Sequence, residues 1–151
     1  TKFKYEPNTY KKITLIGGGS GITPLYQLVH EITKNSSDKT AVHLIYGNKT
    51  AGDILLKKEL DEFAAKHADQ VKLTYFLDAA DAGVKANVGY VSKDWLKENI
   101  PAPADDHKVY VCGPPGLYKA LSGPKVSPTD QGELTGALQE LGYTKEQVYK
   151  Y

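Results

Sequence analysis

The sequence predicts an α/β fold built on a doubly wound, five-stranded parallel sheet. Short runs of β-branched and aliphatic residues alternate with helical segments that carry one apolar face, a pattern typical of βαβ units. Two glycine-rich segments, residues 17–21 and 113–116, each follow a predicted strand directly. Loops at the carboxyl ends of parallel strands form the ligand sites of such sheets. We therefore expect these two segments to border a binding site.

Five segments have the composition of buried strands. They are residues 12–16, 41–46, 71–77, 108–112 and 147–151. A polar loop that runs to about Val88 follows the third strand, and a short helical segment is expected at residues 92–98. Residues 123–128 form an insertion rich in Pro, Ser and Lys with no core pattern.

The longer helices show recognisable start and stop signals. Thr23 followed by Pro24 predicts a capping hydroxyl and a proline at the first helical position. Asp53 is placed to cap a second helix, which would bury Leu56, Leu60, Phe63 and Ala64. Residues 130–133 resemble a capping box that opens a last helix, with Gly142 as its stop.

Composition excludes several classes of function. The chain has 151 residues, enough for one domain, and a formal net charge of +1, which gives no reason to expect nucleic acid or an anionic membrane surface as partner. Its single cysteine and four scattered histidines predict no metal site. No apolar run approaches the length of a membrane-spanning helix. All 19 basic residues are lysine, and without the arginine fork that suits a ribose 2′-phosphate, NAD is favoured over NADP.

The first glycine-rich loop does not fit the common nucleotide-binding patterns. Ile22 stands where the dinucleotide-binding pattern and the nucleophile elbow need glycine, and no Gly-Lys-Ser/Thr follows for a P-loop. What remains is a strand, a run of small residues and a helix start. Free N–H groups and the helix dipole at such a start attract a pyrophosphate. The alternative is a tight strand–helix turn that binds nothing.

The second loop, Cys112-Gly113-Pro114-Pro115, fixes the backbone just after a buried strand. Cys112 could fill space as a small apolar residue. No histidine lies near it in the sequence to act as a base, so a nucleophilic role is not favoured.

Together the two loops resemble the ferredoxin–NADP reductase superfamily. The matching segments are Gly17-Gly18-Gly19-Ser20-Gly21-Ile22-Thr23-Pro24 and Val111-Cys112-Gly113-Pro114-Pro115. The segment Tyr46-Gly47-Asn48-Lys49-Thr50-Ala51-Gly52-Asp53-Ile54-Leu55-Leu56 is similar to the cytochrome b5 reductase branch. Residues 122–132 and the ending Val148-Tyr149-Lys150-Tyr151 resemble its fungal mitochondrial members.

This resemblance implies a five-stranded sheet in the order 3-2-1-4-5, the NAD-binding domain of the ferredoxin reductase type. Residues 1–10 would be an interdomain linker and residues 11–151 the NADH-binding domain. The family holds FAD in an upstream β-barrel through an arginine-containing motif, which this chain lacks. Since the chain begins with Thr rather than Met, we expect a piece of a longer protein that is inactive by itself.

In the whole enzyme, the resemblance implies hydride transfer from NADH to FAD, followed by single-electron transfer to cytochrome b5. Its partners would be cytochrome b5 and the FAD-binding domain, with no membrane contact from this segment. The location would be the mitochondrial outer membrane or intermembrane space, with any anchor outside this chain. Cys112 would position the nicotinamide and Thr23 would lie near the flavin. The implied cofactor-binding residues are Gly18, Gly19, Ser20, Gly21, Ile22, Thr23, Pro24, Asn48, Asp53, Gly113, Pro114, Pro115, Leu117 and Tyr151.

Two other functions remain open from the sequence. The chain could be an NAD(H)-binding regulatory module without redox turnover, or a flavodoxin-like FMN carrier with the same sheet. Asp53 could be a helix cap, a ligand of the adenine ribose, or both.

Overall fold

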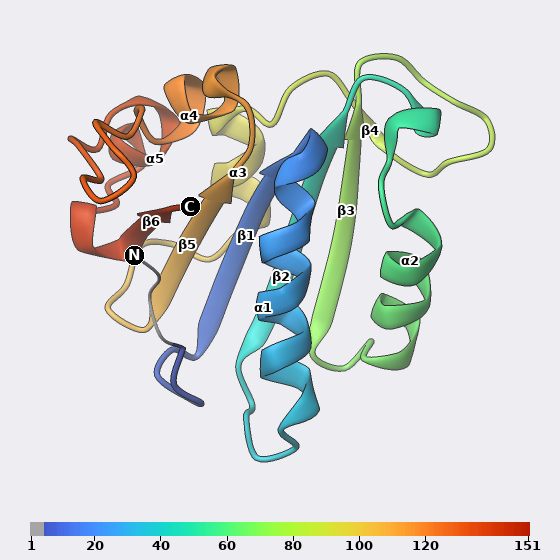
Figure 1. The fold of residues 1–151 in the computed structure, drawn as a ribbon, viewed down its shortest axis with the longest axis horizontal. Coiled ribbons are helices and arrows are strands. Elements are labelled where there is room, and N and C mark those ends of the chain that lie inside the picture. The colour runs from blue at the N-terminus through green and yellow to red at the C-terminus, as the bar shows by residue number, and fades with distance from the viewer. Residues whose placement is uncertain (1–4) are drawn as a thin grey trace.

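The computed structural model describes residues 5–151, which form one parallel sheet flanked by helices on both faces (Figure 1). All neighbouring strands are parallel, in the order β4-β3-β2-β1-β5-β6. Their bounds are β1 (Lys12–Gly18), β2 (Ala41–Asn48), β3 (Val71–Leu77), β4 (Asn87–Val88), β5 (His107–Cys112) and β6 (Val148–Lys150).

The prediction of an α/β parallel sheet is confirmed, and the predicted count of five strands is wrong. The five expected strands are present in the expected relative order. The sixth, β4, extends the sheet beyond β3 by pairing Asn87 with Phe76 and Val88 with Leu77. Two residues are too short to leave a periodic pattern in the sequence, so this strand reads as part of a polar loop.

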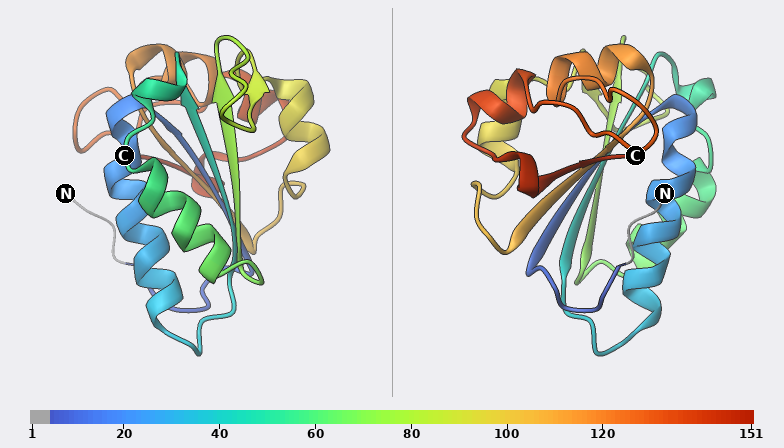
Figure 2. Two further views of the ribbon diagram at one scale, coloured as in Figure 1. Left: turned by 90° about the vertical axis from the view of Figure 1, so that its right-hand side faces the viewer. Right: turned by 60° about the vertical axis from the view of Figure 1, so that its left-hand side comes forward.

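Helices cover the two faces in separate groups, as the turned views show (Figure 2). The longer helices, α1 (Ile22–Lys34) and α2 (Lys57–Lys66), lie on one face. The other face is covered by α3 (Lys93–Asn99), α4 (Pro115–Leu121) and α5 (Gly136–Glu140). The strand order reverses at β1, because β2 lies on one side of it and β5 on the other. That reversal places the crevice of a doubly wound sheet beyond the ends of β1 and β5.

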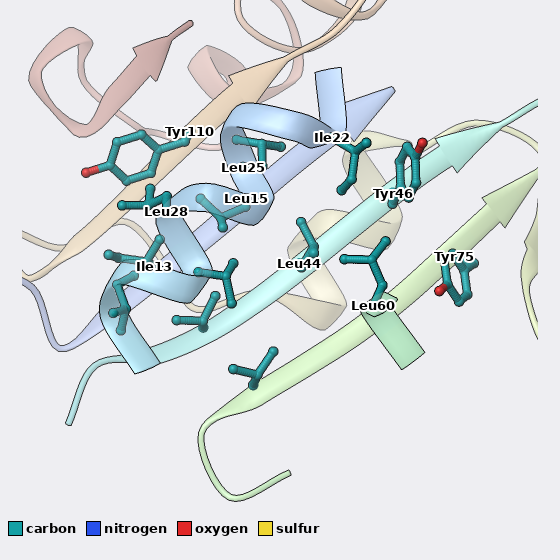
Figure 3. Packing of buried hydrophobic residues seen from close by; sticks show 14 of the residues in the cluster. Ile13, Leu15, Ile22, Leu25, Leu28, Leu44, Tyr46, Leu60, Tyr75 and Tyr110 are labelled. Atoms are coloured by element: carbon teal, nitrogen blue, oxygen red, sulfur yellow. The ribbon is translucent and has the colours of Figure 1, made fainter. Parts of the chain in front are cut away.

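Consecutive residues of a strand point to opposite faces of the sheet and so pack in different hydrophobic clusters. Leu15 belongs to the cluster under α1 and α2, whereas Ile16 belongs to the cluster under the shorter helices, and both are fully buried. Figure 3 shows the first cluster, where Leu25 and Leu28 of α1 pack over β1 and β2. Burial on both faces explains why the strands read as continuous apolar runs.

The start of α1 differs from the prediction. The helix begins at Ile22 with Gly21 as its N-cap, so Thr23 and Pro24 are its second and third residues. The reason is a short 3₁₀ turn, Gly19–Gly21, that leads directly into the helix. Pro24 is still tolerated, because N–H groups in the first turn have no partner within the helix.

Asp53 does not cap α2. That helix begins at Lys57, after Leu56 in a left-handed conformation with a φ of 59°. Asp53 instead ends a separate 3₁₀ turn, Ala51–Asp53, in which it forms a capping box with Thr50. The loop between β2 and α2 is therefore a folded element in its own right.

The last helix also begins later than predicted. Asp130 pairs with Ser127 in a small bridge, and α5 starts at Gly136 with Thr135 as its N-cap. Gly132 and Gly136 have positive φ values, which glycine adopts without strain, and residues 131–135 have no regular structure. No helix was predicted at α4, because it begins within the segment Gly113-Pro114-Pro115-Gly116, whose composition is typical of a turn.

A buried ammonium group anchors the insertion. Lys150 of β6 is 2% exposed, and its Nζ donates to the carbonyl oxygens of Gln131 at 2.7 Å, Glu133 at 2.8 Å and Pro124 at 3.3 Å. The side chain of Gln131 also pairs with the backbone N–H and C=O of Lys150. The insertion is thus fastened to the last strand.

The described part of the predicted linker packs against the α1–β2 connection. The Tyr5 hydroxyl donates to the carboxylate of buried Asp38, and the Asn8 amide donates to the Ser37 carbonyl. Residues 1–4 lie outside the described residues. The division into linker and domain stays a prediction.

Within residues 5–151, no helix combines the length and apolarity needed to cross a bilayer. The same residues contain no group of three or more His, Cys, Asp or Glu side chains that could hold a metal ion.

The buried His43 predicts a pH-dependent stability. Its Nε2 lies 2.8 Å from Thr74 Oγ1, and burial, with Lys72 nearby, lowers the pKa of His43 to about 4. Between pH 6.5 and 4 the unfolded chain binds the proton and the folded chain does not. Stability should therefore fall as the pH drops through this window, by up to about 3 kcal/mol from this group.

Chemical denaturation of the wild type and of His43→Gln at several pH values measures this effect. The stability difference between the two proteins should change across pH 6.5 to 4 and stay constant above pH 7. Parallel curves over the whole range would contradict the assignment.

Candidate functional site

A cleft of about 880 Å³ opens at the carboxyl edge of the sheet. Five segments border it: the residues that follow β1, β2, β3 and β4, and the loop after β5 together with α4. Its volume lies in the range of cofactor sites. The cleft brings together seven of the predicted binding residues, which are Gly18, Gly19, Ser20, Asn48, Asp53, Pro114 and Leu117.

The two glycine-rich loops meet at one edge of this cleft in direct backbone contact. A Cβ atom on Gly21 would lie 2.2 Å from the carbonyl oxygen of Cys112, and one on Gly113 would lie 3.1 Å from the backbone nitrogen of Gly18. A Cβ on Gly18 would lie 3.2 Å from Pro114 Cδ. These glycines are therefore required for packing between the loops. We call this contact the loop junction.

Gly19 and Ser20 differ from their neighbours. Gly19 has a φ of 53°, and an added Cβ would meet no atom within 4 Å. Both residues line the cleft. They form the part of the first loop whose backbone a ligand can approach, at the entry to α1. This arrangement suits an anion, since the first N–H groups of a helix carry partial positive charge.

Asp53 is exposed on the wall formed by the loop after β2. Its Oδ2 accepts hydrogen bonds from the backbone nitrogen of Thr50 at 3.3 Å and from Thr50 Oγ1 at 2.9 Å. The predicted role of Asp53 as the cap of α2 is wrong: Asp53 is the third residue of the 3₁₀ turn and pairs with Thr50, the N-cap of that turn. Both bonds end on the same oxygen, so capping leaves the ribose role open.

Cys112 does not line the cleft. Its half-buried side chain packs against the first core cluster, and burial raises the pKa of the thiol, partly opposed by a hydrogen bond with Tyr118. A raised pKa disfavours the thiolate needed for a nucleophile. Tyr151 lies beside it, with its backbone nitrogen donating to the Val111 carbonyl at 2.9 Å.

Other predicted residues also lie outside the cleft. Ile22 is fully buried in the first core cluster, so its side chain cannot touch a ligand. Thr23 is exposed in the first turn of α1. The remaining residues that do not line it are Gly21, Pro24, Gly113, Pro115 and Tyr151.

Sequence reasoning missed several residues that line the cleft. Tyr90 is 88% exposed and Leu55 is 48% exposed, which is unusual for large apolar side chains. Phe76 and Leu121 form part of the inner wall and belong to the second core cluster. The exposure of Tyr90 cannot be read from the sequence, and its place next to Gly89, just after β4, is a weak signal.

A family model described as an oxidoreductase NAD-binding domain matches residues 15–123. The chain belongs to this family. The match includes both glycine-rich loops and every strand from β2 to β5, so the family and the cleft rest on the same part of the chain.

Curated relatives agree with this membership and narrow it. NADH-cytochrome b5 reductase 2 of Scheffersomyces stipitis is 67% identical over 150 residues, which covers 99% of this chain and 50% of that protein. The protein of the same name from Candida albicans is 62% identical over 151 residues, with coverage of 99% and 50%. The predicted resemblance to cytochrome b5 reductases is confirmed. The chain spans about half the length of these relatives.

Solved structures share the fold. The cytochrome b5 reductase domain of Ulva prolifera nitrate reductase has a TM-score of 0.78 and 31% identity, covering 94% of this chain and 50% of that one. The CS-b5R domains of human Ncb5or in the NAD⁺ form reach a TM-score of 0.75 at 19% identity, covering 99% of this chain and 40% of that one. At that lower identity the likeness concerns the fold alone.

The loop junction predicts opposite effects for two glycine substitutions. Gly21→Ala should lower the free energy of unfolding by about 1–3 kcal/mol, because its methyl group collides with backbone atoms that cannot move without separating the loops. Gly116→Ala should be neutral or stabilising by up to about 1 kcal/mol, because Gly116 lies in α4 with no atom within 4 Å of the added group.

Urea denaturation of the two variants and the wild type tests this contrast. Equal stability of the Gly21→Ala protein and the wild type would show that the loops do not pack as described.

Proposed function

We propose that this chain is the NADH-binding half of a flavoprotein reductase that delivers electrons from NADH to cytochrome b5. The observation that carries the proposal is the 67% identity over 99% of the chain to a protein named NADH-cytochrome b5 reductase 2. The cleft supports it independently, because the open backbone of Gly19 and Ser20 and the carboxylate-bearing Asp53 line the same cavity. Likeness to fungal mitochondrial members supports a mitochondrial location as part of the proposal.

The residues of the cleft suit a dinucleotide. The backbone of Gly19 and Ser20 at the start of α1 would hold the pyrophosphate, and Asp53 would contact the adenine ribose. Tyr90 and Leu55 offer apolar surface for a flat base. Asn48 is the last residue of β2 and lines the cleft, with a buried Nδ2 that has no hydrogen-bond partner within the described part of the chain. A polar ligand would satisfy such a donor.

The nicotinamide end of the bound NADH would extend beyond the cleft, past the loop junction, toward Cys112 and Tyr151. These two side chains pack against the first core cluster, whereas the inner wall of the cleft belongs to the second. Bound NADH would supply a hydride to FAD held mainly by the other half of the enzyme, which then gives single electrons to haem. On this side of the junction, Cys112 would hold the ring in place, with Thr23 exposed near the flavin.

The two alternative functions, a regulatory NAD(H) module and an FMN carrier, differ from the reductase half in what the isolated chain binds. A regulatory NAD(H) module would bind NADH tightly by itself and never meet a flavin. An FMN carrier would be yellow in isolation. The names and double length of the relatives favour the reductase half over both.

Reassembly with a flavin domain tests the proposal. We expect this chain alone to be colourless and inactive, and to bind NADH weakly because part of the nicotinamide site belongs to the upstream half. Joined to the FAD domain of a close relative, it should support NADH-dependent reduction of ferricyanide and of cytochrome b5. Stoichiometric flavin in the isolated chain, or no flavin reduction by NADH in a folded fusion, would contradict it.

Asp53 should discriminate between NADH and NADPH. A carboxylate at the ribose repels a 2′-phosphate by roughly 1–3 kcal/mol. Asp53→Asn should lose this repulsion while its amide oxygen can still accept from Thr50, so the ratio of the two dissociation constants should move toward one. Asp53→Ala should show the same change with an added loss of stability, since the cap is gone.

Titration of both variants with NADH and NADPH, alongside thermal unfolding, measures the two effects separately. An unchanged ratio in the Asp53→Asn protein would leave Asp53 with the capping role alone.

A further inference from the structure

A buried hydroxyl connects two walls of the cleft. Tyr46 lies near the carboxyl end of β2 and is fully buried, with its ring in the first core cluster. Figure 3 shows it next to Ile22, the first residue of α1. Its hydroxyl donates to the carbonyl oxygen of Gly19 at 2.8 Å and accepts from the backbone nitrogen of Leu55 at 3.2 Å.

These two bonds reach both loops that carry the proposed phosphate and ribose contacts. Gly19 belongs to the loop after β1, and Leu55 follows Asp53 in the loop after β2. Both residues line the cleft, whereas Tyr46 itself does not. Burial raises the pKa of Tyr46, so the hydroxyl keeps its proton at neutral pH and remains a donor to Gly19.

The bond to Gly19 fixes the direction of one peptide group. In a planar trans peptide, the C=O of one residue and the N–H of the next point in opposite directions. Since the Gly19 carbonyl points inward to a buried hydroxyl, the N–H of Ser20 points away from the core. Gly19 has a positive φ, and no atom lies within 4 Å of the position that a Cβ would take, so without this bond the peptide could rotate at little steric cost.

We propose that Tyr46 is a positioning residue for anion binding: its hydroxyl holds the Gly19–Ser20 peptide with the N–H directed outward, ready for the pyrophosphate of a dinucleotide. The proposal rests on the proposed function and adds the residue that organises the phosphate site. Tyr46 does not contact the ligand. It acts through the backbone of the first loop, and the same hydroxyl accepts a hydrogen bond from Leu55 in the loop after β2.

Tyr75 provides a matched control. It is also a buried tyrosine of the first cluster, on the neighbouring strand β3, with its ring centroid 6.4 Å from that of Tyr46. Its hydroxyl donates to Asp61 Oδ1 of α2 at 2.7 Å, and it does not line the cleft. Tyr75→Phe therefore removes a buried tyrosine hydroxyl from the same core without touching either loop.

The experiment compares the wild type, Tyr46→Phe and Tyr75→Phe by NMR titration with NADH, ADP-ribose and adenosine. Loss of one organising hydrogen bond should weaken NADH and ADP-ribose binding to the Tyr46→Phe protein by about tenfold. Adenosine, which has no phosphate, should lose much less affinity for the Tyr46→Phe protein than ADP-ribose does, because its contacts lie in the loop after β2 and not at the Gly19–Ser20 peptide. The Tyr75→Phe protein should bind every ligand as the wild type does, although it loses stability.

The outcomes of these titrations distinguish an error in the proposed function from an error in the role of Tyr46. If the wild type binds neither NADH nor ADP-ribose, the proposed function is contradicted. If the wild type binds both and Tyr46→Phe binds them equally well, the role of Tyr46 is contradicted. An equal loss for adenosine, or the same loss in Tyr75→Phe, would also contradict it, because the effect would then come from the core rather than from the peptide.

A measurement on the unaltered protein covers the case in which Tyr46→Phe does not fold. The amide signal of Ser20 should shift strongly with ADP-ribose and remain in place with adenosine. No shift of that amide at saturating ADP-ribose would contradict the proposal.

Discussion

The site depends on the backbone contact between the loops that follow β1 and β5. No side chain separates them: a single methyl group on Gly21 would lie 2.2 Å from the Cys112 carbonyl oxygen. Because β1 and β5 are neighbours in the sheet, their connections leave its carboxyl edge side by side. Glycine allows them to close against each other, and the space left between them and the loop after β2 is the cleft.

The rest of the fold holds this contact in place. Buried clusters on both faces fix β1 and β5, and α1 starts directly from the first loop, so its dipole acts at Gly19 and Ser20. Behind the second loop, Lys150 ties the insertion to β6 and so secures the strand next to β5. Packing between the loops thus determines at which positions only glycine fits. Gly19, where an added Cβ would meet no atom, is the position that a ligand can approach.

Most of the sheet could be predicted because its five longer strands are buried on both faces and carry dense apolar runs. β4 could not be predicted, because a strand of two residues is too short to show a hydrophobic pattern. Helix starts were less predictable: Thr23-Pro24 has the ideal composition for a helix start, yet the preceding turn already begins the helix at Ile22.

For the site, the two loops could be predicted from their runs of glycine. The roles of Tyr46 and Tyr90 could not be predicted, because they depend on which strands are neighbours in the sheet. Cys112 and Tyr151 were each predicted to contact the cofactor, and the structure places them beside each other but outside the lining of the cleft.

A crystal structure of this chain with NADH would test the central claim most directly. We expect the pyrophosphate to lie against the backbone of Gly19 and Ser20, the adenine ribose to lie beside Asp53, and the loop junction to stay closed between Gly21 and Cys112. A smaller hollow of about 300 Å³ lies at the opposite edge of the sheet, near Lys12, Val42 and Gln70. NADH bound there, or bound at the cleft with the pyrophosphate away from Gly19 and Ser20, would contradict the account.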